Sequence, residues 1–410
     1  MKKFHIFPSK IKSGLFYHRA IGEYQGLPLH LRVEQDGSGI LIINASRMLF
    51  LNRTAAEYIH LFLDGKNEEE VAKEIRKKFR VDKETAIRDY KDLLFIINTF
   101  AKTNDIDPVS YLGVEKIEPF EKELSAPYMM DLAITYRCDT NCYVRTSHTM
   151  SELNTEEWFK VIDKLGTLGV PHVIFTGGEP TLRDDLDKLI SYVQKTGLVS
   201  GLETSGRKLR DNSYLNHLIE AGLDHIQITV ESHDKEIHDK ITGVNGSWKE
   251  TIQGLKNAIA TPVYTITNTT INQHNAKDIL KTIDFLHNLG LKQFACNSII
   301  YSDETSNVPK ELTLDEESIK PLITKIEDYS EILGMDFIWY TPQNHILKSL
   351  ELEEVLSDTS ACRTNLYIEP NGTVIPYQNY VTPLGNILTD NWEKIWNNPL
   401  CNELRNRKQA

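Results

Sequence analysis

Short apolar runs alternate with amphipathic stretches through residues 127–345. The apolar runs are rich in β-branched residues and predict strands, whereas apolar positions three and four apart predict helices between them. The predicted strands are Met130–Thr135, His172–Thr176, Ser200–Thr204, His225–Val230, Val263–Thr267 and Gln293–Asn297. The predicted helices span 155–165, 186–193, 214–221, 248–259 and 279–289. Six such repeats predict a parallel α/β sheet with right-handed crossovers, for which an eight-stranded barrel and a doubly wound sheet are general alternatives.

A different pattern precedes this region. Three strand-like runs at 29–34, 39–44 and 48–52 are followed by three amphipathic helices, the first with Thr54 as its expected N-cap. Strands followed by helices predict a small α+β domain with its own core over residues 1–102, and residues 103–126 are expected to be a linker. The remaining segment, 346–410, is expected to form a short C-terminal extension.

Composition narrows the class of protein. The net charge of −12 argues against nucleic acid and anionic membranes as partners. No apolar run reaches the roughly 20 residues that a bilayer span needs, and the N-terminus has no apolar segment typical of a signal peptide. A cytoplasmic location is therefore expected. The cysteines are too few for a disulfide framework, and Cys296 and Cys401 are expected to be buried apolar residues.

The candidate chemistry lies after the first two strands of the α/β region. Cys138 and Cys142 follow the first strand, and Gly177-Gly178-Glu179-Pro180 follows the second. This pair of motifs resembles the radical S-adenosylmethionine (SAM) superfamily, whose signature is C-x3-C-x2-C followed by a GGEP-type loop. The resemblance implies a partial (β/α)6 barrel that binds a [4Fe–4S] cluster and SAM. In that family the reduced cluster cleaves SAM to a 5′-deoxyadenosyl radical, which abstracts hydrogen from the substrate.

The cysteine loop lacks one thiol of the family signature, and two alignments are open. In the first, Cys138 and Cys142 are the first and second ligands, and Arg145 replaces the third. In the second, three residues are missing before Tyr143, and Cys142 corresponds to the third ligand. Arginine cannot ligate iron because its guanidinium stays protonated. His148 is a further nitrogen donor on this loop.

The resemblance assigns further cofactor-binding residues at strand ends, where barrel active sites lie. Gly177, Gly178, Glu179 and Pro180 would meet the SAM amino group, since glycines allow close approach and a carboxylate binds an ammonium. Thr204 and Ser205 resemble the family's T-N-G segment. Thr229 and Glu231 resemble its Q-I-S-L-D segment, which faces the SAM ribose and carboxylate. His238–Gly243 and Gly246–Trp248 match a further family pattern, with loop and cap chemistry as the structural alternative.

The flanking regions resemble those of peptide maturases. The "LNRTAAEY" segment at 51–58 and the helix pair over 71–90 resemble the winged-helix-like (PqqD-like) peptide chaperone of pyrroloquinoline-quinone biosynthesis. In that family a leader peptide adds as a strand at the sheet edge, and a generic helical accessory domain is the alternative. Cys362, the Glu369–Gly372 turn and Leu384–Ile387 resemble the extension that carries auxiliary clusters (SPASM/twitch). Tyr377 stands where that pattern has a second cysteine, so auxiliary clusters are not expected.

These resemblances imply a radical SAM enzyme that modifies a ribosomally made, leader-docked precursor peptide. A reductant such as a flavodoxin or ferredoxin would be its electron donor. The missing thiol supports a different hypothesis, in which the chain is a catalytically silent relative that acts as a peptide-binding or scaffold subunit. A third possibility is that the gap is an error in this sequence and the parent protein is active.

Overall fold

The computed structural model describes residues 11–19, 28–43, 47–102, 124–140, 151–298, 310–340, 361–378 and 380–406. The chain divides into two compact units near residue 126, and the first unit also takes in 163–171 and 195–199. Cys142, Tyr143, Arg145 and His148 lie outside the described residues, as does most of the expected linker.

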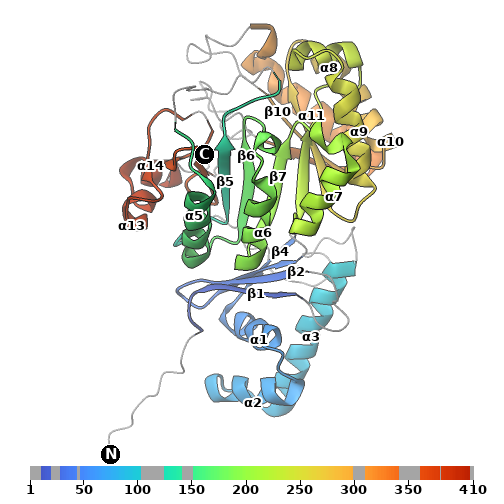
Figure 1. Cartoon of the computed structure of the whole chain (residues 1–410). Helices are drawn as coiled ribbons and strands as arrows, with labels where there is room; N and C mark the ends of the chain where they lie inside the picture. Colours follow the sequence, from blue (N-terminus) through green and yellow to red (C-terminus); the bar gives the residue numbers. More distant parts are fainter. Residues whose placement is uncertain are drawn as a thin grey trace, which may run out of the picture. The chain divides into compact units, whose positions relative to one another are not determined.

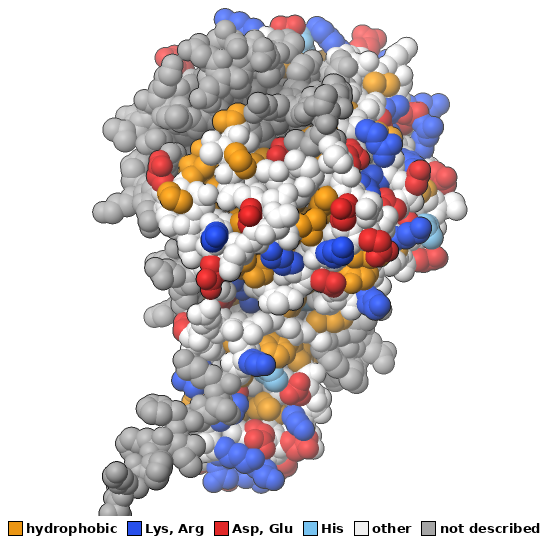
Figure 2. All heavy atoms as spheres, turned by 60° about the vertical axis from the view of Figure 1, so that its left-hand side comes forward, with side chains coloured by type: hydrophobic (Ala, Val, Ile, Leu, Met, Phe, Trp, Pro, Cys, Tyr) orange, Lys and Arg blue, Asp and Glu red, His pale blue; other side chains and the backbone are white. Residues whose placement is uncertain are grey.

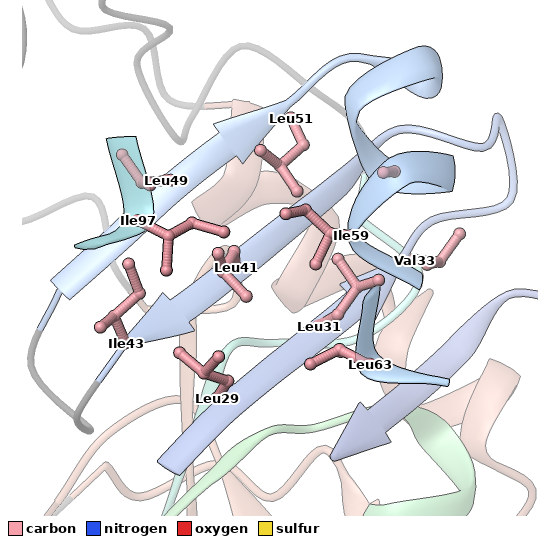
Figure 3. Close-up of a cluster of buried hydrophobic side chains, with 11 residues drawn as sticks. Leu29, Leu31, Val33, Leu41, Ile43, Leu49, Leu51, Ile59, Leu63 and Ile97 are labelled. Carbon is pink, nitrogen blue, oxygen red and sulfur yellow. The ribbon is translucent and has the colours of Figure 1, made fainter. Parts of the chain in front are cut away.

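The N-terminal unit pairs an antiparallel sheet with three helices. The sheet has the order β1-β2-β3-β4, from β1 (Gly14–Arg19), β2 (Pro28–Val33), β3 (Gly39–Ile43) and β4 (Arg47–Leu51). The helices α1 (Arg53–Leu63), α2 (Glu68–Lys78) and α3 (Lys83–Lys102) follow it. Figure 3 shows the core, in which strand side chains such as Leu31 and Leu41 meet Ile59 of α1 and Ile97 of α3.

Two features of this unit differ from the sequence prediction. β1 is an additional strand, which pairs with β2. The expected cap, Thr54, is wrong: Asn52 is the N-cap of α1, and its side chain accepts a hydrogen bond from the Ala55 amide at 2.9 Å. The Asn52 side chain can satisfy an amide of the first turn from just outside the helix, whereas Thr54 is already inside it.

Ile59→Ala should weaken this unit strongly because Ile59 is fully buried. Truncating a buried isoleucine costs about 3 kcal/mol, which corresponds to roughly 100-fold faster exchange of amides that open with this unit. Hydrogen exchange of the β2 and β3 amides in the full chain measures this. Phe95→Ala on α3 is the control, since Phe95 is 59% exposed and should change exchange little. Equal exchange in the two variants would contradict the packing described.

The second unit is built on one ten-stranded sheet of order β11-β10-β9-β8-β7-β6-β5-β12-β13-β14. Its parallel strands are β5 (Met129–Thr135), β6 (His172–Gly177), β7 (Val199–Thr204), β8 (His225–Thr229), β9 (Tyr264–Ile271), β10 (Gln293–Ser298), β11 (Asp336–Trp339) and β12 (Asn365–Ile368), with β13 (Thr373–Ile375) and β14 (Gly385–Asn386) antiparallel beyond β12. All six predicted strands are present, and β11 is a further one. The order of the strands is open at both ends, as in a partial barrel.

Helices connect these strands. They are α5 (Thr155–Leu168), α6 (Leu186–Thr196), α7 (Asn212–Ala221), α8 (Lys235–Thr242), α9 (Ser247–Ile259), α10 (Ile279–Asn288) and α11 (Glu316–Leu333), followed by α13 (Trp392–Trp396) and α14 (Pro399–Asn406) in the C-terminal region. Figure 1 shows α5, α6 and α7 over one face of β5, β6 and β7. Leu132 of β5, Leu202 of β7 and Ile226 of β8 are fully buried.

Two surface properties bear on the partners. Within the described residues, no helix is both long and apolar enough to cross a membrane. On the face shown in Figure 2, acidic and basic side chains are interspersed, and no broad basic area is visible among the coloured atoms.

Candidate functional site

The glycine loop after β6 packs against the start of the cysteine loop. The Gly178 amide donates to the Thr135 carbonyl at 2.8 Å, and the Glu179 amide donates to the Arg137 carbonyl at 2.7 Å. A Cβ on Gly178 would lie 2.3 Å from the Arg137 oxygen and 2.7 Å from Cys138 Sγ. A Cβ on Gly177, whose φ is +127°, would lie 2.2 Å from the Thr135 oxygen. Both glycines are therefore required for the sulfur of Cys138, the predicted iron ligand, to lie against the loop.

Glu179 joins this loop to the end of β7. Its Oε1 accepts hydrogen bonds from the Thr181 amide at 3.0 Å, the Thr181 hydroxyl at 2.5 Å and the Thr204 hydroxyl at 2.8 Å. Its Oε2 accepts from the Ser205 amide at 2.7 Å. The carboxyl is buried, and this burial raises its pKa. A carboxylate has about four acceptor positions, so little capacity is left, and an ammonium would have to approach Oε2.

Pro180 follows from the same geometry. Glu179 is the N-cap of a short 3-10 turn, Pro180–Leu182, with proline at its first position. Proline suits that position because its missing amide would have no partner there. Glu179 and Pro180 thus shape the loop that Gly177 and Gly178 allow to approach Cys138.

An ion pair that the sequence did not predict holds the cysteine loop. Asp139, next to Cys138, lies 3.0 Å through Oδ2 from Nη1 of Arg207. The same Nη1 donates to the Asp139 carbonyl, and Arg207 Nε pairs with Glu250 at 2.7 Å. Arg207 follows the Thr204–Ser205 pair and therefore connects the end of β7 with the start of the cysteine loop. No local sequence pattern marks a pair separated by 68 residues.

Thr229 and Glu231 lie at and after the end of β8. Thr229 is partly exposed, whereas Glu231 is 8% exposed. The Thr270 amide donates to Glu231 Oε2 at 3.2 Å, and burial raises the pKa of the carboxyl to about 8. Among the described residues no hydrogen bond joins either residue to Glu179. The structure thus brings Cys138, the glycine loop, Thr204 and Ser205 together, and places Thr229 and Glu231 on a separate strand of the same sheet edge.

Glu231 should make stability depend on pH. Because its folded pKa of about 8 lies above the ordinary 4.5, the folded protein binds more protons between these values. Its stability should fall as the pH rises through that window, by on the order of a few kcal/mol. Glu231→Gln should reduce the fall, measured as urea midpoints at pH 5, 6.5 and 8.5. The exposed Glu236→Gln should keep the wild-type slope, and an unchanged slope in Glu231→Gln would refute the assignment.

The His238–Gly243 and Gly246–Trp248 segments show capping chemistry. Asp239 on α8 accepts from the Gly246 amide at 2.6 Å, the Trp248 amide at 2.8 Å and the Ser247 hydroxyl at 2.9 Å. These groups belong to the first turn of α9, where a carboxylate satisfies free amides. This motif therefore fixes α8 against α9, in agreement with the alternative that these segments provide loop and cap chemistry.

The C-terminal region contains a thiol pair that the sequence did not predict. The predicted Glu369–Gly372 turn is present, and the Gly372 amide donates to the Glu369 carbonyl at 2.8 Å. Cys362 and Cys401 are both fully buried and unbonded to other cysteines. A hydrogen bond with Cys362 lowers the pKa of Cys401, and nearby Arg405 contributes. The predicted burial of Cys296 and Cys401 is confirmed.

Comparison with protein families now bears on this site. Residues 134–301 match the radical SAM superfamily, and residues 360–410 match SPASM, an iron–sulfur cluster-binding domain. Residues 134–301 are a radical SAM domain. The first match spans the cysteine loop, the glycine loop and the strand ends described above. The two matches agree with the predicted cofactors, an iron–sulfur cluster and SAM.

Curated relatives are similar to parts of this chain. The Fe-coproporphyrin III synthase of Methanosarcina barkeri is 30% identical over 45% of this chain and 47% of that protein. The PqqA peptide cyclase of Bradyrhizobium diazoefficiens is 32% identical over 35% of this chain and 39% of that protein. The PqqA peptide cyclase of Rhizobium meliloti is 27% identical over 61% of this chain and 67% of that protein. The chain thus spans less than half the length of the first two relatives.

Solved structures confirm the predicted fold class. SuiB of Streptococcus suis, bound to its precursor peptide SuiA, superposes with a TM-score of 0.60 at 16% identity, covering 97% of this chain and 90% of that one. The anSMEcpe structure with bound AdoMet gives a TM-score of 0.53 at 16% identity, covering 67% and 82%. At such identities the likeness shows the fold alone: an α/β domain with a parallel sheet, preceded by a small antiparallel sheet.

The described residues fit the two cofactors at the radical SAM domain's sheet edge. Cys138 Sγ lies where a Gly178 Cβ would collide with it, so the glycine loop lies directly beside the first predicted iron ligand. Iron ligation requires the thiolate form of Cys138. The partly exposed Ser205 and Thr229 supply polar groups along the same edge.

Proposed function

We propose that this chain is a radical SAM enzyme that modifies a ribosomally made precursor peptide. The observation that carries the proposal is the contact of Cys138 Sγ with the Gly177–Pro180 loop at the carboxyl edge of the parallel strands. Cys138 and Cys142 would bind the cluster. Once bound, the reduced cluster and SAM would provide the radical chemistry that abstracts a hydrogen atom from the substrate.

This chain's own residues would position SAM. The Gly177–Glu179 backbone lies beside the cysteine loop, and Glu179 holds it to Thr204 and Ser205. In this proposal the Glu179 Oε2 atom and the loop backbone contact the SAM amino group. Tyr143, Thr229 and Glu231 would contact the rest of the cofactor. Arg207 would fix the cysteine loop through Asp139.

The N-terminal unit would bind the leader segment of the peptide. Its sheet ends at β1 and β4, each of which pairs with one neighbour among the described residues. An edge strand offers unpaired amides and carbonyls to an extended peptide. SuiB was solved with its precursor peptide, and the cyclase relatives act on a peptide, which supports a PqqD-like role for this unit. A flavodoxin or ferredoxin would supply the electron.

SAM cleavage tests the enzymatic part. The full chain is reconstituted anaerobically with iron and sulfide, and 5′-deoxyadenosine is measured after addition of dithionite and SAM. Production of 5′-deoxyadenosine is expected, and Cys138→Ser should abolish it. Cys296→Ala is the matched control, because Cys296 is buried on β10, separated from β5 by four strands. No product from the wild type would reject the enzyme.

The second candidate function is a silent peptide-binding or scaffold subunit. It is favoured by the presence of only two cysteines on the 138–145 loop. The test adds to the full chain a synthetic copy of a precursor peptide whose gene lies beside the gene for this protein. Binding of this peptide should protect amides of β4 or β1 from hydrogen exchange. Protection without SAM cleavage would support this candidate, whereas no protection would remove peptide binding from both.

A further inference from the structure

The inner face of the radical SAM domain's sheet is polar in mid-strand. Asp131 of β5, Glu203 of β7 and Gln227 of β8 are partly exposed, whereas their neighbours Leu132, Leu202 and Ile226 are fully buried on the helix-covered face. Glu203 pairs with Gln227 in register, so the two side chains point to the same face. The same face also carries the buried Ile174 and Tyr367, which both pair in register with Asp131, so these polar side chains interrupt a face that is otherwise partly apolar.

Hydrogen bonds connect these groups across several strands. Thr176 and Gln227 donate to Glu203 at 2.9 and 3.2 Å, and the Tyr340 hydroxyl donates to the side-chain Oε1 of Gln227 at 3.0 Å. Asn365 of β12 donates to Asp131 Oδ2 at 2.8 Å. These are all neutral donors.

The two carboxyl groups lack a cationic partner. Within the described part of the chain, neither Asp131 nor Glu203 forms an ion pair with lysine, arginine or histidine. Limited access to water, together with the nearby charge of Glu203, raises the pKa of Asp131 to about 8. Two neighbouring acids with little access to water and no counter-charge are costly to keep ionised, so a cation placed between them would be favoured.

Unpartnered acceptors on the same face also indicate a donor ligand. Asn365 is 8% exposed, and its Oδ1 has no hydrogen-bond partner, although the same amide group donates to Asp131. Asn268 of β9 is 7% exposed, its Oδ1 is also unpartnered, and it pairs in register with Thr229 of β8. Carboxylates and free amide oxygens together match a group that carries several N–H donors.

We propose that the inner face of β5–β8, with Asp131 and Glu203 at its centre, binds the alkylammonium or guanidinium group of a basic side chain in the substrate. The assignment of this basic group to a peptide substrate rests on the proposed function. An organic cation is favoured over a metal ion, because the described residues contain no group of three or more His, Cys, Asp or Glu that could hold one.

Titration calorimetry of the full chain without cluster tests the site directly. The probes are n-butylammonium and N-ethylguanidinium, with n-butanol and tetramethylammonium as controls that lack the charge or the N–H donors. Both probes should bind, and Glu203→Gln or Asp131→Asn should weaken them at least about tenfold, as expected when one partner of a buried charge pair is removed. Glu220→Gln, exposed on α7, should bind as the wild type does.

The controls separate the outcomes. Equal heats for n-butylammonium and n-butanol, or tighter binding of Mg²⁺ than of either probe, would overturn the proposal using the wild type alone, whether or not the variants fold. Undiminished affinity in both folded variants would also overturn it. Because the assay needs neither cluster nor SAM, probe binding without SAM cleavage would keep the cation site and reject the enzyme. SAM cleavage without probe binding would reject only the substrate class.

Discussion

Gly178→Ala is expected to destabilise the radical SAM domain and to prevent retention of an iron–sulfur cluster. The new Cβ would lie 2.3 Å from the Arg137 carbonyl oxygen and 2.7 Å from Cys138 Sγ. The obstacle is backbone rather than a flexible side chain, so relief requires the two loops to separate. Overpacking of this kind costs about 3 kcal/mol. Urea unfolding measures the loss, and iron per chain after anaerobic reconstitution measures cluster retention.

Gly166→Ala provides the matched control. Gly166 lies inside α5, and the nearest atom to its Cβ is 4.0 Å away. Alanine in a helix is favoured over glycine by up to about 1 kcal/mol, so this variant should be as stable as the wild type or more so. If Gly178→Ala unfolds at the wild-type urea concentration and retains the same iron, the contact between the two loops is not as close as the structure shows.

The sequence predicts the main fold because its strongest signals are local. The six central strands are apolar runs followed by amphipathic helices, and each is present. β1 and β11 were missed because their pairing is decided by tertiary context. The four residues of β11 begin with an aspartate, and β1 becomes a strand only through its register with β2. Short segments of this kind carry too little pattern to be distinguished from loops.

The sequence predicts the parts of the site that belong to one contiguous motif, but it does not predict contacts between residues that lie far apart in the sequence. Gly177–Pro180 was located by its spacing from Cys138, and the structure shows the steric reason for both glycines. Glu179 was expected to bind an ammonium, but most of its acceptor capacity satisfies Thr181, Thr204 and Ser205. No sequence pattern distinguishes Arg207 from an ordinary surface arginine, so its role could not be predicted.

The cysteine loop allows a test that works by gain rather than loss. Arg145→Cys would complete the C-x3-C-x2-C spacing with Cys138 and Cys142. Each added thiolate holds one more iron of a [4Fe–4S] cluster. Even residues that only support a ligand change metal affinity by about 10–100-fold, so a direct ligand should slow iron loss to a chelator at least about tenfold. Iron per chain during an anaerobic EDTA challenge is the measurement.

Two further variants make this result specific. Arg145→Ser removes the arginine without adding a thiolate and should lose iron as fast as the wild type. Insertion of a cysteine-bearing tripeptide before Tyr143 tests the alternative alignment, in which Cys142 is the third ligand. Both variants supply three cysteines in the C-x3-C-x2-C spacing, but they differ in the residues that follow the third cysteine. The correct alignment should therefore be the one whose variant shows the slower iron loss and the faster SAM cleavage. Iron loss that is equally fast in Arg145→Cys, Arg145→Ser and the insertion would mean that this loop no longer holds a cluster, and the silent-subunit function would then be favoured.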